Sequence, residues 1–193
     1  VPRSLGNQAV WYATERLDPS DDYYGSLAGK RYSVKSARPP RPEVPGDFAQ
    51  LQEVLAALEE NFWLGGVGLR VSPPLLAIVI EYGVHVTGKP HKRIEHLIKT
   101  LGGYWELGPR EFDIHGVVRS EVAAEPGRAH YDSFRVFLCN DGLLNFQGRP
   151  IRGCAKDPLA TDQAALRKFL RDCCGTAKMH PSRSWPAPGE LMR

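Results

Sequence analysis

Leu75-Leu76-Ala77-Ile78-Val79-Ile80 is the longest strongly apolar run in this chain of 193 residues. A short run of aliphatic residues between Pro74 and Glu81 predicts a strand that is buried on both faces. Residues 89–101 then change to helical spacing, with apolar residues three or four positions apart and basic residues between them. The apolar positions are Ile94, Leu97, Ile98 and Leu101. A buried strand and the basic, amphipathic helix that follows it are therefore expected at the centre of the fold.

Upstream of this centre, the sequence predicts two short strands and one helix. The strands are expected at Lys30–Ser36 and Val67–Ser72, separated by a proline-rich connector and the helix. Asp47 is expected to cap the helix, with Gln50 completing a capping box and Gly65-Gly66 ending it. The apolar face of this helix would consist of Phe48, Leu51, Leu55, Leu58 and Phe62.

Downstream of Ile80, the pattern predicts mostly strands. The central strand is expected to continue to Val86 with one apolar face, and Asn140-Asp141-Gly142 predicts a tight hairpin. A final helix is expected to start near Leu159 or Asp162 and to end at Cys174, with Leu166, Phe169, Leu170 and Cys173 on its buried side. Further strands are expected at residues 104–107, 111–122, 131–139 and 143–147.

Strands grouped late in the chain and joined by a hairpin indicate an α+β fold, a mainly antiparallel sheet with about three helices packed on it. A doubly wound α/β fold is less favoured because strands and helices do not alternate strictly. We expect an N-terminal arm at residues 1–28, one core domain at residues 29–175 and a C-terminal tail at residues 176–193. Polar arms need a surface on which to lie, which favours a subunit of a larger assembly.

The composition is typical of a globular protein, with 42% hydrophobic and 24% charged residues, and it excludes a wholly disordered chain. The four cysteines include no Cys-x-x-Cys pair, so we expect reduced thiols in a reducing intracellular compartment. An organelle matrix stays open if Val1 is the new end left by a removed targeting peptide. Neither a transmembrane segment nor a secretory signal is predicted.

The net charge of +3 is distributed in blocks, with basic flanks around a more acidic middle. This layout suits contact with RNA or another polyanion, and equally with acidic protein neighbours. Cations interleaved with aromatic residues suit phosphate contact with stacking, although no signature of a sequence-specific RNA-binding domain is present. The candidate contact residues form three clusters: Lys30, Arg31, Lys35, Arg38 and Arg41; Lys89, Lys92, Arg93 and Lys99; and Arg167, Lys168 and Arg171.

No metal site and no cofactor are expected. His91 and His96 are five residues apart, about 140° around a helix, so they cannot face one ion. His91 could pair with Glu95 only if further ligands came from elsewhere in the fold. A zinc site would need Cys173, Cys174 and His180 with Cys139 or Cys154, but adjacent cysteines are poor chelators.

An enzymatic alternative rests on Cys139 at the end of a strand, with His115 or His130 as its base. Glu111 and Asp113 share one face of a predicted strand and are interpreted as solvated surface rather than as an acid–base pair. No serine nucleophile elbow, phosphate-binding loop or dinucleotide fingerprint is present.

Three functional hypotheses follow from the sequence. The leading one is a non-enzymatic structural or interaction subunit of a larger assembly, whose arms and basic patches contact protein neighbours or a nucleic-acid backbone. The second is an enzyme with a cysteine–histidine site near Cys139. The third is a nucleic-acid-binding protein that acts alone, for which binding must weaken as salt rises.

Overall fold

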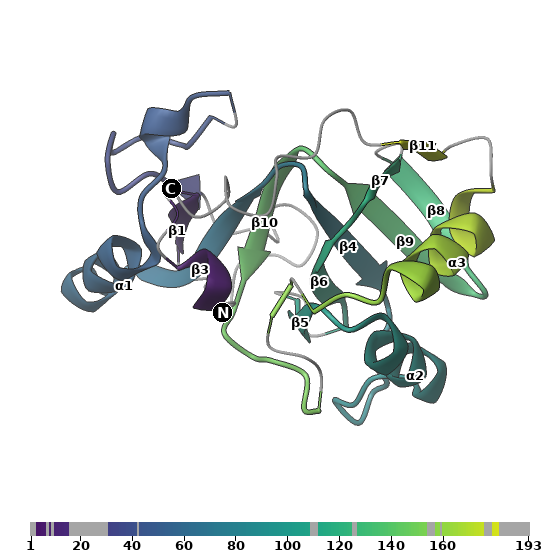
Figure 1. Cartoon of the computed structure of the whole chain (residues 1–193). Coiled ribbons are helices and arrows are strands. Elements are labelled where there is room, and N and C mark those ends of the chain that lie inside the picture. Colours follow the sequence, from purple (N-terminus) through teal and green to yellow (C-terminus); the bar gives the residue numbers. More distant parts are fainter. Residues whose placement is uncertain are drawn as a thin grey trace.

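The computed structural model describes residues 3–6, 8, 10–15, 31–41, 43–108, 112–124, 127–153, 157–158, 160–175 and 179–181. Within these residues the fold is α+β, as the sequence predicts, with two larger antiparallel sheets and a short strand pair (Figure 1). The described α-helices are α1 (Leu51–Glu60), α2 (Lys92–Leu101) and α3 (Gln163–Cys174). No helix in this part of the chain is long and apolar enough to cross a membrane.

A five-stranded antiparallel sheet forms the larger half of the molecule. β4 lies in its middle, which confirms that the apolar run starting at Leu75 is the centre of the core. In spatial order the strands are β5 (Tyr104–Leu107), β6 (Ile114–Arg119), β4 (Leu75–Glu81), β9 (Phe134–Cys139) and β8 (Gly127–Tyr131). The expected strand at residues 104–107 is confirmed.

The four-stranded sheet corrects one expectation about the N-terminal segment. Its spatial order is β10 (Gly142–Phe146), β3 (Leu64–Val71), β1 (Trp11–Glu15) and β2 (Arg31–Tyr32). Trp11 and Ala13 of β1 are fully buried between β2 and β3, so this part of residues 1–28 belongs to the core and not to an arm. The rest of the predicted arm is only partly described.

The predicted hairpin at Asn140-Asp141-Gly142 is wrong. β9 pairs with β4 in the five-stranded sheet, and β10 pairs with β3 in the four-stranded sheet. Residues 140–141 therefore connect a strand of one sheet to a strand of the other. Ser72-Pro73-Pro74 does the same for β3 and β4. The two paths form one bent antiparallel ribbon that joins the sheets. A Gly after Asn-Asp gives a local turn signal, but the pairing partner is chosen by long-range contacts.

The real hairpin lies earlier, at Asp132-Ser133, where β8 turns into β9. The expected single strand at residues 131–139 is therefore two strands. Two other expectations change as well. β7 (Val122–Ala124) is separate from β6 and pairs with β11 (Met179–Pro181), which comes from the predicted tail. Beyond Glu81 the chain leaves the sheet, because Tyr82 adopts a left-handed conformation with φ of 56°.

α1 begins later than the sequence predicts. Gln50 is its N-cap and forms the capping box with Glu53. Asp47 lies upstream in a 3-10 helix, where it is buried and accepts a hydrogen bond from the Arg41 guanidinium at 3.0 Å. The Asp47 carboxylate therefore binds Arg41 instead of capping α1. Glycines 65 and 66 belong to β3.

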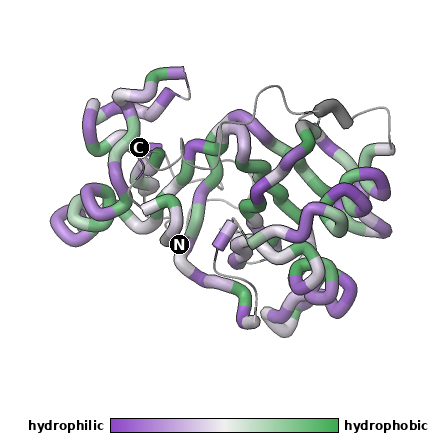
Figure 2. Tube along the Cα trace, in the orientation of Figure 1, coloured by the Kyte–Doolittle hydropathy of each residue, from purple (hydrophilic) through white to green (hydrophobic). Residues whose placement is uncertain are grey.

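Two apolar clusters hold these elements together. α2 and α3 cover one face of the five-stranded sheet and bury the apolar stripes that the sequence predicts for both helices. The second cluster lies between the two sheets and extends to α1. Hydrophobic and hydrophilic residues alternate along each helix in Figure 2, as expected for helices with one buried side.

Candidate polyanion-binding groove

A tight loop at residues 83–91 leads from β4 to α2 and fixes the first turn of that helix. The His85 amide donates to the Lys89 carbonyl at 2.8 Å, and the His91 amide donates to the Gly83 carbonyl at 2.9 Å. His91 is the N-cap of α2. Because backbone hydrogen bonds hold the loop, Lys89 and His91 have fixed positions beside the start of the helix.

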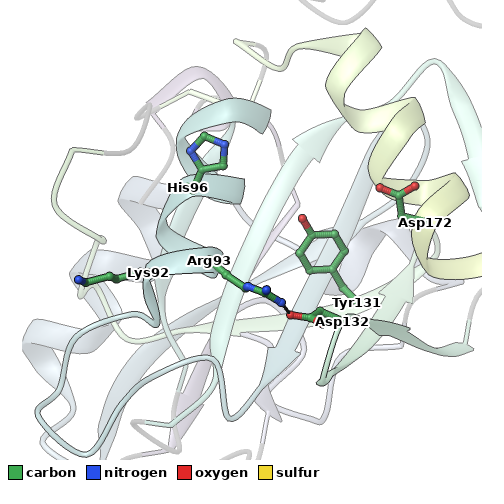
Figure 3. A pocket seen from close by; sticks show the side chains of 6 residues that line it. All are labelled: Lys92, Arg93, His96, Tyr131, Asp132 and Asp172. Carbon is green, nitrogen blue, oxygen red and sulfur yellow. Dashed lines mark ion pairs between the residues drawn. The ribbon is translucent and has the colours of Figure 1, made fainter.

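Two adjoining cavities of about 520 and 420 Å³ form a groove between α2, the β8–β9 turn and α3. Both are lined by Lys92, Arg93 and Asp132, so we treat them as one site and call it the α2 groove. Figure 3 shows Arg93 extending from α2 toward Asp132, while Asp172 projects from α3. The lining is completed by His91, His96, Tyr131, Ser133, Phe134 and Asp172.

Arg93 and Asp132 form an ion pair across the α2 groove (Figure 3). The two side chains are 73% and 42% exposed, and exposed ion pairs contribute about 0–1 kcal/mol to stability. Asp132 has a φ of 55°, a left-handed conformation that aspartate tolerates better than most residues. The pair therefore orients Arg93, and because it is weak, the guanidinium can leave the Asp132 carboxylate for an anion of higher charge.

Aromatic rings line one end of the α2 groove. The ring centroids of His85 and His91 are 5.5 Å apart, and those of His91 and Phe134 are 5.3 Å apart. Deeper in the groove, the ring of Tyr131 packs against Phe169 of α3 with centroids 5.2 Å apart. The groove therefore combines two cations, two carboxylates, hydroxyl groups and flat rings.

Ion pairs neutralise half of the predicted contact residues. The pairs are Lys35–Glu53, Arg41–Asp47, Arg93–Asp132, Lys99–Glu95, Arg167–Glu121 and Lys168–Asp172. Arg31, Arg38, Lys89, Lys92 and Arg171 form no ion pair with another described residue. Lys30 lies outside the described residues. Of the twelve, Lys92 and Arg93 line the groove, and Lys89 lies on the preceding loop and lines neither cavity.

Histidines of the α2 groove do not form a metal site. His91 precedes the helix and His96 lies one turn inside it, and the two line different halves of the groove. Among the described residues, no group of three or more His, Cys, Asp or Glu side chains could hold a metal ion. The alternative zinc site at Cys173 falls partly outside this description, because Cys154 and the His180 side chain are not described.

Cys139 is separated from both histidines that were considered as its base. Its thiol donates to the Asp141 carbonyl at 3.1 Å, and it packs against the apolar cluster between the sheets. His115 lies two strands away and two residues along the sheet, a separation of about 10 Å or more. His130 lies four residues along the neighbouring strand from the position opposite Cys139.

The prediction that Asp113 belongs to the solvated surface is wrong. Asp113 is buried, and its carboxylate accepts a hydrogen bond from the Tyr82 amide at 3.2 Å. This contact accompanies the left-handed conformation of Tyr82 and ends the central strand. Glu111, the other member of the predicted pair, lies outside the described residues.

Sequence reasoning missed the acidic and aromatic side of the α2 groove. Tyr131, Asp132 and Phe134 fall in what was predicted to be one strand, although an Asp-Ser pair between two aromatic residues is a possible turn signal. Asp172 has no local signal, because its approach to α2 depends on how α3 packs. The cation positions are visible in the sequence, and so is the i, i+4 pair of Glu95 and Lys99, but the carboxylate partner of Arg93 is not.

No family model matches this chain, and a search of curated proteins found no match. The function of the α2 groove is therefore inferred from its own geometry.

Proposed function

We propose that this chain is a non-enzymatic interaction protein that binds the phosphate backbone of a nucleic acid in the α2 groove, as a subunit of a larger assembly. The observation that carries the proposal is that Lys92 and Arg93 both line the groove, and that Lys89 lies on the loop that leads into the same helix. In the other predicted clusters, carboxylates within the chain pair with Lys35, Arg41, Arg167 and Lys168.

The placement of these cations is unfavourable for the isolated helix. Lys92 and Arg93 are the first two residues of α2, where the positive end of the helix dipole disfavours cations. Each such placement costs about 0.3–1 kcal/mol on an exposed helix. A phosphate in the groove would remove this conflict, because it is attracted both by the side chains and by the helix terminus.

Arg93 can bind a phosphate if it exchanges the Asp132 carboxylate for the phosphate oxygens. A phosphate accepts two parallel hydrogen bonds from a guanidinium, as a carboxylate does, but carries its charge on a polymer that adds contacts along the groove. Breaking the exposed Arg93–Asp132 pair costs little. Tyr131 and Ser133 add hydroxyl groups that can donate to phosphate oxygens.

Two charge-matched triple variants test the proposal. Lys89→Ala/Lys92→Ala/Arg93→Ala removes the groove cations, and Lys35→Ala/Arg167→Ala/Lys168→Ala removes the same charge from paired cations elsewhere. Binding of a fluorescent single-stranded RNA of about 20 nucleotides is measured by anisotropy. We expect the groove variant to lose about tenfold or more in affinity, and the control variant to lose about threefold or less.

Equal losses in the two variants would contradict a localised site and indicate only general electrostatic attraction. Failure of the wild-type chain to bind RNA at low salt would also overturn the proposal. If a polyglutamate peptide bound with the same dependence on the groove cations and RNA did not, the partner would be an acidic protein.

A further inference from the structure

One part of the five-stranded sheet has a face that no described helix covers. α2 and α3 lie on the opposite face, against Val136 and Leu138 of β9 (Figure 1). Because successive side chains of a strand point to opposite faces, the residues between them face away from the helices. Four such residues form a patch that we call the open sheet face: Arg128 and His130 on β8, and Arg135 and Phe137 on β9.

The open sheet face combines an exposed ring with exposed cations. Phe137 is 40% exposed, although it lies on a strand that is paired on both sides. The Arg135 side chain is 64% exposed and lies 3.7 Å from the Glu81 carboxylate, a long and weak pair. Arg128 and His130 are exposed, and their side chains form no ion pair or hydrogen bond with another described residue.

Strand register sets the spacing of these groups. Arg128 lies directly opposite Phe137, and His130 lies directly opposite Arg135. Opposed residues have Cβ atoms about 5 Å apart, and residues two apart on one strand are separated by about 7 Å. The Phe137 ring therefore has a guanidinium within reach on two sides, across the strands and along β9.

From this arrangement we infer that the open sheet face is a stacking platform for single-stranded nucleic acid. An unpaired base stacks on the Phe137 ring, and Arg128 and Arg135 hold the phosphates on either side of it. Stacking on an exposed ring requires a base that is free of its complementary strand, so duplexes are excluded from this contact. An acidic peptide would use the two arginines but would gain nothing from the flat ring between them.

This surface is distinct from the α2 groove and does not depend on it. The groove offers its cations to phosphates, whereas the open sheet face also contacts bases. The two surfaces adjoin at the β8–β9 turn, which carries Asp132 of the groove at one end of both strands. A single strand that passes around this turn can contact both surfaces at once.

The test distinguishes contacts to bases from contacts to phosphates. Binding of a ten-nucleotide oligouridylate is compared with binding of an abasic oligonucleotide of equal length, for the wild type and for Phe137→Ala. Phe62→Ala is the matched control, since Phe62 is 85% exposed and lies beside α1. We expect Phe137→Ala to weaken oligouridylate binding about tenfold and to leave abasic binding unchanged, while Phe62→Ala changes neither.

A second variant guards against a purely structural effect. Phe137→Trp keeps a flat ring, so it should retain oligouridylate affinity, and its fluorescence should be quenched when the base stacks. Equal weakening of both ligands by Phe137→Ala, or no weakening of either, would overturn the inference. The groove triple variant should weaken both ligands, so failure of the groove proposal and failure of this one give different results.

Discussion

The two faces of the five-stranded sheet are built from alternate residues of the same strands, yet they differ in almost every property. The face toward α2 and α3 is closed by aliphatic and aromatic side chains. The opposite face is in part packed against the second sheet, where it buries Glu106 and His115, and in part exposed at β9 and β8. The face toward the helices is therefore mainly apolar, whereas the opposite face combines an apolar part under the second sheet with buried polar groups and an exposed, charged part.

This comparison indicates where substitutions should matter for folding and where they should matter for binding. Residues under the helices are mostly apolar and buried, so their replacement should act on stability. On the other face, replacement of the hydrogen-bonded Glu106 should act on pH dependence, and replacement of the exposed residues of β8 and β9 should act on ligand affinity. The following variants test the contrast in order of decreasing expected effect.

Phe169→Ala should cause the largest loss of stability. Phe169 is buried between α3 and the sheet and packs against Tyr131, so truncation leaves a cavity. Phenylalanine-to-alanine changes in a core cost about 3–5 kcal/mol. Phe137→Ala on the opposite face is the matched control and should cost about 1 kcal/mol or less. Urea unfolding measures both, and similar losses would contradict the proposed asymmetry.

Gly116→Ala should be the next most disruptive change. Gly116 faces the Trp105 ring on the neighbouring strand, and a Cβ atom at this position would lie 2.3 Å from that ring. Overpacking of this kind costs about 1–3 kcal/mol. Gly46 has no atom within 4 Å of an added Cβ, so Gly46→Ala should be neutral or slightly stabilising. Thermal unfolding of the two variants checks the difference.

Glu106 should make the free energy of unfolding depend on pH. Burial raises the pKa of its carboxyl above the ordinary value, although hydrogen bonds from the Tyr104 hydroxyl and the Gln147 amide favour the charged form. The folded chain then binds the proton more tightly than the unfolded chain does. Stability from this group is present at low pH and is lost as pH rises from the ordinary glutamate pKa through the raised one.

Glu106→Gln cannot titrate, so unfolding free energies of the wild type and the variant should be compared across this pH range. The wild type should lose stability relative to the variant as pH rises. Asp47→Asn provides a control of opposite sign, because the Arg41 guanidinium lowers the pKa of Asp47. A flat difference for Glu106→Gln would show that burial does not perturb this carboxyl.

Asp132→Asn should have the smallest effect on stability, and it should strengthen RNA binding. Asparagine tolerates the left-handed turn, and an exposed ion pair contributes about 1 kcal/mol at most. Removal of the carboxylate frees Arg93, so RNA affinity should rise about two- to fivefold. Glu121→Gln frees Arg167 outside the groove and should leave affinity unchanged. A loss of affinity in Asp132→Asn would contradict the role assigned to Arg93.

Local patterns in the sequence predicted the elements whose stability is also local. The stripe from Ile94 to Leu101 and the end of α3 at Cys174 are determined within a few turns, and the apolar run from Leu75 favours a central strand. The α+β class followed from these elements. The cation positions of the groove were also visible, because charge is a property of the sequence.

Long-range pairing could not be obtained in the same way. Residues 140–142 carry a turn signal, but β10 pairs with β3, about seventy residues earlier in the chain. Trp11–Glu15 lacks a clear period because both of its faces are buried. Some carboxylates that pair with the predicted cations come from other elements, such as Asp132 for Arg93 and Glu121 for Arg167, so local patterns could not identify these pairs.

The salt dependence of RNA binding tests the central claim most directly. The affinity of the wild type and of Lys89→Ala/Lys92→Ala/Arg93→Ala for the same single-stranded RNA is measured over a series of salt concentrations. Each phosphate contact contributes about 0.7 to the slope of log affinity against log salt for single strands. The slope should therefore become shallower by about 2 in the variant. An unchanged slope would show that the α2 groove does not contact the phosphate backbone.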